Sequence, residues 1–136
     1  MKVLIIQSHD GWLRLCKMWI NNSLPHYHVG NVTYTNSFDH AIDLMKEKKF
    51  SLIITSAIFH DAKSEHRDTA TRTIPDIQKK PNTLAGIVKK TNPETKVYVL
   101  SNQKKEEYET SLINGWISKK VNPKHEIIGL VNTAVR

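Results

Sequence analysis

Short runs of consecutive apolar residues alternate along the chain with segments in which apolar residues recur every three or four positions. The apolar runs lie in Val3–Ile6, residues 50–56, Lys96–Ser101 and Gly115–Ser118. Residues 27–35 are rich in β-branched residues around Gly30 and are a further candidate strand. Apolar runs without polar alternation are typical of strands buried on both faces. Because helical segments separate the strands, we expect parallel βαβ units in a (βα)5 order: an α/β three-layer sandwich around a five-stranded parallel sheet.

The segments between the first strands show the spacing of amphipathic helices. We expect the first helix to begin with Asp10 as its cap and to end before Pro25. Its predicted apolar face comprises Trp12, Leu15, Cys16 and Trp19. Ser37 is a good cap for a second helix. That helix is predicted to bury Phe38, Ala41, Ile42 and Met45.

The second half of the chain predicts three more helices and one long connection. The helices cover residues 82–90, residues 104–113 and a last segment in which Asn122 is the cap and Pro123 takes the first helical position. Residues 59–81 are polar and too long for an ordinary connection, so we expect an insertion loop there. It is either a mobile surface excursion or an ordered lid or docking element. Residues 1–136 leave room for a single domain.

Composition narrows the class of protein. The chain is 39% hydrophobic and 24% charged, and no apolar stretch approaches the roughly 18 residues that span a bilayer. The first apolar run is too short for a secretory signal, and a lone cysteine excludes an intrachain disulfide, so we expect a cytoplasmic protein without membrane contact. The net charge of +7 comes from lysine pairs scattered over the whole chain, a pattern typical of solvated faces.

The candidate chemistry lies just past each strand. Ligands of open parallel sheets bind at the carboxyl ends of the strands, and the residues there are Gln7, Ser8, Ser56, Ser101 and Lys119. These side chains can form hydrogen bonds, but they offer no carboxylate for a divalent cation and no ready acceptor for a phosphoryl group. The seven histidines also lack the spacing of a structural zinc site. We therefore expect no metal and no cofactor.

Four stretches together resemble the receiver domain of bacterial two-component response regulators, the CheY-like family, over nearly the whole chain. They are MKVLIIQSHD, FSLIITS, NPETKVYVLSN and NGWISKKVNP, of which the last two are the more specific. The resemblance implies the flavodoxin-like fold. It also implies that Ser101 matches the hydroxyl that contacts the phosphoryl group, that Lys119 matches the conserved cation, and that Trp116 matches the switch aromatic.

The same resemblance marks a loss. Gln7 and Ser8 stand where receivers carry metal-binding acids, and Ser56 stands where they carry the phosphate-accepting aspartate. We therefore expect a degenerate pseudo-receiver that is not an enzyme: a phosphorylation-independent regulatory module that acts through protein contacts in signal transduction or transcriptional regulation. Two alternatives stay open, namely a basic nucleic-acid-associated protein and a sensor of a small anion or small molecule at the degenerate phosphate site.

The resemblance also implies where a protein partner would bind. In receivers the face formed by the fourth helix, the fifth strand and the last helix is the usual partner and dimer surface. The residues expected on or near it are Tyr108, Trp116, Lys104, Lys105 and Lys120. Aromatic side chains with basic neighbours favour an interface, and a homodimer through this face is one candidate assembly.

Overall fold

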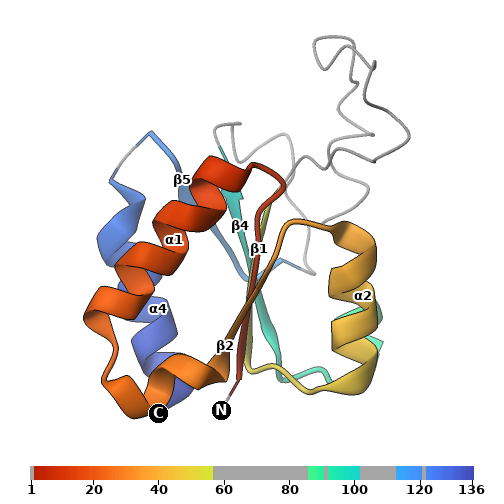
Figure 1. Ribbon diagram of the computed structural model, residues 1–136. Helices are drawn as coiled ribbons and strands as arrows, with labels where there is room; N and C mark the ends of the chain where they lie inside the picture. The colour runs from red at the N-terminus through yellow and green to blue at the C-terminus, as the bar shows by residue number, and fades with distance from the viewer. Residues whose placement is uncertain (1, 57–85, 91, 102–112, 121) are drawn as a thin grey trace, which may run out of the picture.

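Five parallel strands form the centre of the molecule in the computed structural model, which describes residues 2–56, 86–90, 92–101, 113–120 and 122–136 (Figure 1). The strands are β1 (Val3–Ile6), β2 (Val32–Thr35), β3 (Leu52–Ser56), β4 (Lys96–Ser101) and β5 (Gly115–Ser118). Their order in the sheet is β2-β1-β3-β4-β5, and every neighbouring pair is parallel. The predicted α/β, flavodoxin-like architecture is confirmed.

Helices cover both faces of this sheet. The regular ones are α1 (Asp10–Ser23), α2 (Phe38–Glu47) and α4 (Pro123–Val135), and residues 86–90 are helical as well. In Figure 1, α1 and α4 lie together against one face, while α2 lies against the other. No helix in the described part of the chain is both long and apolar enough to cross a membrane.

The strands divide their side chains between two buried clusters. Leu4, Ile6 and Ile53 face the α2 side, whereas Val3, Ile5 and Ile54 face the α1 and α4 side. Successive side chains of a strand point to opposite faces of the sheet, so an uninterrupted apolar run supplies both clusters at once. This is why the central strands are recognisable from the sequence as continuous apolar segments.

The prediction for residues 27–35 was partly wrong. Only β2 is a strand, and the preceding His26–Asn31 form a 3-10 helix, η1. The amide of His28 donates to the carbonyl of Pro25 at 2.9 Å, which closes the turn just after the end of α1. The β-branched residues of this segment favour a strand, but the local hydrogen bond holds the backbone in a turn. His26 and His28 consequently do not share a strand face.

Two details of α1 also differ from expectation. The cap is His9, whose ring accepts a hydrogen bond from the amide of Trp12, and Asp10 is already the first helical residue. The carboxylate of Asp10 instead accepts a hydrogen bond from the Asn36 amide at 2.9 Å. Leu15 is 37% exposed, so the buried stripe runs through Cys16 and Ile20. The cap therefore lies one residue earlier than predicted, and the side of α1 that faces the sheet is centred on Cys16 and Ile20.

The other helix predictions have mixed outcomes. Ser37 caps α2 as expected, since its hydroxyl accepts a hydrogen bond from the amide of His40 at 3.2 Å. Pro123 starts α4, but Asn122 adopts a left-handed conformation with φ of 34° and its side chain forms no capping hydrogen bond. The predicted helix at residues 104–113 and the insertion loop at residues 59–81 lie outside the described residues, save for Ile113.

Candidate functional site

The carboxyl ends of the strands meet at one edge of the sheet. The register pairs Ile6 with Thr55 and Ser101 with Ser118, so the residues that follow each strand lie side by side. Two further backbone bonds continue the ladder, from Gln7 N to Thr35 O and from Lys119 N to Ser101 O, each 3.1 Å long. The structure therefore brings together the predicted set of Gln7, Ser8, Ser56, Ser101 and Lys119 at this edge.

Gln7 is the most deeply buried polar residue of this site. Its side chain is 0% exposed, and neither its Oε1 nor its Nε2 has a hydrogen-bond partner in the part of the chain that the structure describes. A buried amide without partners costs about 1–3 kcal/mol, and a buried carboxylate at the same position would cost more. The first strand therefore ends in a neutral side chain that has no charge to offer a cation.

The hydroxyl of Ser56 forms a bridge between β1 and β3. Its Oγ accepts a hydrogen bond from the amide of Ser8 at 2.9 Å and lies within 3.5 Å of the carbonyl of Ile6, to which it donates. Both partners are backbone atoms, and the residue is only 4% exposed. The geometry gives Ser56 a structural role in tying two strands together.

No general base reaches this hydroxyl from the segment that follows β1. The ring of His9 caps α1 through Trp12, and the carboxylate of Asp10 is bonded to Asn36. A serine hydroxyl needs an adjacent base to act as a nucleophile. His9 and Asp10, the two titratable residues that directly follow Ser8, are thus engaged elsewhere.

The cation of the site has an aromatic partner. The ammonium of Lys119 lies 4.8 Å from the centre of the Trp12 ring, which itself meets Trp19 edge to face with ring centres 6.2 Å apart. Partial burial lowers the pKa of Lys119 below its usual 10.5. The face of an indole ring carries partial negative charge and attracts a cation at this distance. The ring thus offsets part of the cost of burying this charge.

The predicted interface residues fall into two groups. Trp116 is half-buried and packs against the apolar cluster on the α2 side, whereas Lys120 is exposed just past β5. Lys104, Lys105 and Tyr108 lie outside the described residues. Trp116 therefore serves at least in part as a packing residue.

The described residues of this edge do not supply the ligand set of a metal site. Within the described ranges there is no group of three or more His, Cys, Asp or Glu side chains that could hold a metal ion. A site for Mg²⁺ normally includes one or two carboxylates. The described side chains at the strand ends can therefore donate and accept hydrogen bonds, but they do not form a carboxylate site for Mg²⁺.

The Trp12–Lys119 contact is the feature of the site that sequence reasoning missed. Trp12 is correctly expected on the apolar face of α1, and Lys119 is correctly expected past β5. The parallel topology could have predicted this contact. Trp12 lies at the start of the helix that follows β1, and Lys119 follows the end of β5, so both lie where the strands end.

Several solved structures with the same fold are response regulator receiver domains. The receiver domain of the Francisella response regulator 1452 is 19% identical, with a TM-score of 0.66 over 98% of this chain and 95% of that one. An orphan response regulator of H. pylori is 15% identical, with a TM-score of 0.59 over 100% of this chain and 97% of that one. The beryllofluoride-activated DrrB receiver domain is 14% identical, with a TM-score of 0.63 over 98% and 96% of the two chains.

Sequence comparison adds no closer relative. No protein-family model matches the chain, and no curated protein matches it significantly. At these identities the structural likeness establishes a receiver-like fold, and the chemistry of the site has to be argued from the side chains of this chain.

Proposed function

We propose that the chain is a single receiver-like domain that regulates through protein contacts, without phosphorylation, Mg²⁺ or catalysis of its own. The observation that carries this proposal is the neutral character of the strand ends. Gln7, Ser8 and Ser56 occupy the positions where a receiver needs carboxylates. The Ser56 hydroxyl is hydrogen-bonded to the carbonyl of Ile6 in β1 and to the amide of Ser8. Mg²⁺ and an acyl-phosphate linkage both require acidic oxygens that these residues do not have.

The environment of Lys119 supports the same proposal. In a working phosphate site this cation would face an anion, but here its ammonium lies over the Trp12 ring. A cation–π contact is worth about 0.5–2 kcal/mol, depending on how far the charge is removed from water. This contact stabilises the cation at the strand ends and does not require a phosphoryl group.

A groove beside the last helix favours protein contact as the mode of action. It has a volume of about 500 Å³ and lies between α4 and the beginning of β4, next to the edge strand β5. Its apolar lining includes Leu52, Tyr98, Leu130 and Ala134. The groove shares the last helix, α4, with the face on which the resemblance implies a partner. A homodimer through this face is our first candidate.

The decisive experiment measures Mg²⁺-dependent binding of beryllofluoride, a mimic of the phosphoryl group, by tryptophan fluorescence. Trp12 lies beside Lys119 and is therefore a reporter at the site. The natural chain should show no saturable, Mg²⁺-dependent change. A saturable change would contradict phosphorylation independence.

A matched variant provides the positive control. The triple substitution Gln7→Asp, Ser8→Asp and Ser56→Asp restores all three acids while leaving Ser101 and Lys119 in place. We expect this variant to gain Mg²⁺ binding if circular dichroism shows that it folds. Sedimentation equilibrium of the natural chain and of Leu130→Arg, which places a charge in the groove, tests the dimer separately. A monomer at all concentrations would remove the homodimer but not a larger protein partner.

A further inference from the structure

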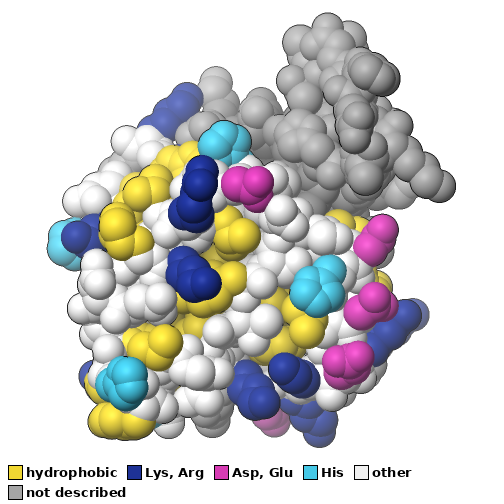
Figure 2. Space-filling view, viewed as in Figure 1, with side chains coloured by type: hydrophobic (Ala, Val, Ile, Leu, Met, Phe, Trp, Pro, Cys, Tyr) yellow, Lys and Arg dark blue, Asp and Glu magenta, His cyan; other side chains and the backbone are white. Residues whose placement is uncertain are grey.

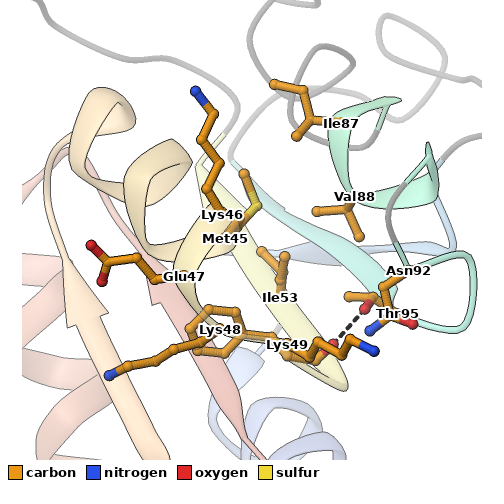
Figure 3. A pocket seen from close by; sticks show the side chains of 11 residues that line it. Met45, Lys46, Glu47, Lys48, Lys49, Ile53, Ile87, Val88, Asn92 and Thr95 are labelled. Atoms are coloured by element: carbon orange, nitrogen blue, oxygen red, sulfur yellow. Dashed lines mark hydrogen bonds between the residues drawn. The ribbon is translucent and has the colours of Figure 1, made fainter.

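The opposite edge of the sheet contains a cavity that the proposed function does not use. It has a volume of about 300 Å³ and opens between the end of α2 and the helical residues 86–90, at the amino ends of β3 and β4 (Figure 3). Ser56 and Lys119 lie at the other ends of the strands, so this cavity is separate from the degenerate phosphate site. Its size is at the lower end of the range for small-molecule sites.

The walls of this cavity are apolar. Figure 3 shows Met45, Ile53 and Val88 converging on it from α2, β3 and residues 86–90. Phe50, which is 3% exposed, also lines the cavity, and its carbonyl accepts a hydrogen bond from the hydroxyl of Thr95. That bond satisfies the backbone polar group next to the cavity, and the remaining surface favours an aliphatic or aromatic group.

The mouth of the cavity is basic. Exposed lysines line it together with a single acidic residue, and they are Lys46, Lys48 and Lys49, beside Glu47. In Figure 3, Lys49 extends across the mouth toward Asn92, whereas Lys46 and Lys48 point outward into solvent. Figure 2 shows that Lys and Arg side chains gather at this lower edge of the molecule, beneath α2.

Lys49 and Asn92 are the donors that would meet a ligand first. Both also line a second hollow of about 320 Å³ on the same edge, to which Lys2 adds another cation. Lysine side chains are long and can turn toward an anion, and an amide adds a neutral donor of fixed position. An apolar wall with cationic donors at its rim is complementary to a molecule that has an apolar body and one anionic end.

We propose that this cavity binds a small amphiphilic carboxylate, with its apolar body among Met45, Ile53 and Val88 and its carboxylate held by Lys49 and Asn92. Nothing in this proposal depends on the loss of phosphorylation, because it rests on residues at the other edge of the sheet. A bound molecule would bridge α2 and residues 86–90, so its presence would change the stability of that side of the sheet.

The test is a titration of the full chain with octanoate, followed by methyl NMR signals of Ile53, Ile87 and Val88. Octanol supplies the apolar body without the charge, and butyrate supplies the charge with a shorter body. We expect saturable shifts with octanoate and at least about tenfold weaker binding of butyrate, which has four fewer methylene groups to bury. Octanol should bind about two- to fivefold more weakly than octanoate.

Charge variants separate this site from general attraction to a basic protein. Lys49→Glu, at an exposed position, should weaken octanoate binding about fivefold or more and leave octanol binding unchanged. Lys124→Glu makes the same charge change at an exposed position on α4 and should leave octanoate binding unchanged.

Four results would overturn the proposal. They are the absence of saturable shifts up to about 10 mM octanoate, an equal effect of the two charge variants, shifts confined to Leu130 in the groove beside α4, and co-sedimentation with anionic phospholipid vesicles without any response to octanoate.

Discussion

The ammonium of Lys119 lies 4.8 Å from the centre of the Trp12 ring, which joins the end of β5 to the first turn of α1. The sequence places these residues far apart, and only the parallel topology brings them to one edge. At that edge the indole ring lies against the ammonium of a partly buried lysine. The interaction energy of Trp12 and Lys119 therefore shows how much this contact stabilises the folded chain.

A double-mutant cycle with Trp12→Leu and Lys119→Met measures this energy. We expect Trp12→Leu to lower the free energy of unfolding, and the coupling energy to be about 0.5–2 kcal/mol, because methionine keeps the apolar stem of Lys119 but removes the charge. Urea unfolding of all four proteins at pH 7.5 provides the values. A coupling energy of zero within error would mean that the ring and the ammonium are neighbours without attraction.

Ser56→Ala tests the structural role of the hydroxyl at the end of β3. The variant leaves the amide of Ser8 without its 2.9 Å acceptor in a mostly buried position, so the free energy of unfolding should fall by about 1–3 kcal/mol. Ser118→Ala is the matched control, because its hydroxyl also accepts a backbone amide bond, from Lys120 at 3.2 Å, but at an exposed position. Water can replace that acceptor, so the control should lose less than about 0.5 kcal/mol. Equal losses would contradict the prediction.

The apolar pattern predicted the strands well because burial on both faces leaves few alternatives for such residues. Strands β4 and β5 have the predicted bounds, and β3 begins two residues later than expected. The 3-10 helix η1 was missed because a single turn after Pro25 depends on local backbone hydrogen bonds, which β-branched composition does not reveal.

The sequence predicted which residues lie at the candidate site, but not which contacts their side chains make. The strand ends gave Gln7, Ser56 and Lys119, since parallel strands place their carboxyl ends together. The hydrogen bond from Ser8 to Ser56 and the position of Lys119 over Trp12 depend on side-chain conformations and on distances between elements. The cavity at the opposite edge also depends on how α2 and residues 86–90 pack, which periodicity does not determine.

Gly115→Ala tests a close approach within the sheet. A Cβ atom at this position would lie 2.5 Å from Cε1 of the Tyr98 ring, so the ring would have to leave its place against the α4 side of the core. We expect a loss of about 1–3 kcal/mol in the free energy of unfolding. Gly129→Ala is the control: it lies inside α4 with open space around it, and there alanine should stabilise by about 0.5–1 kcal/mol. Thermal and urea unfolding of the two variants should therefore differ in sign.

We expect the buried thiol of Cys16 to make the folded chain less stable at alkaline pH. Burial raises the pKa of the Cys16 thiol from 9.0 to about 11, an effect that the nearby charge of Lys119 opposes only in part. Above pH 9 the unfolded chain loses this proton while the folded chain keeps it, so the free energy of unfolding falls as pH rises from 9 to 11, by about 2 kcal/mol for this group.

Lys119 and Tyr34 change the alkaline profile in opposite directions. Burial lowers the pKa of Lys119, so its folded form releases a proton before the unfolded chain does, and its contribution to stability rises with pH below 10.5. Burial raises the pKa of Tyr34, so its contribution falls above pH 10. Cys16→Ala removes the thiol and, with it, the smaller effect that its charge has on the pKa values of both groups, whose main cause, burial, stays in place.

Urea unfolding of the natural chain and of Cys16→Ala at pH 7.5, 9 and 10.5 isolates the thiol. The variant should be less stable at pH 7.5, because it leaves a small cavity beneath α1. Between pH 9 and pH 10.5 it should lose less stability than the natural chain, because it has no thiol to ionise on unfolding. Parallel losses in the two proteins over this interval would show that the buried thiol does not control the alkaline limit of the fold.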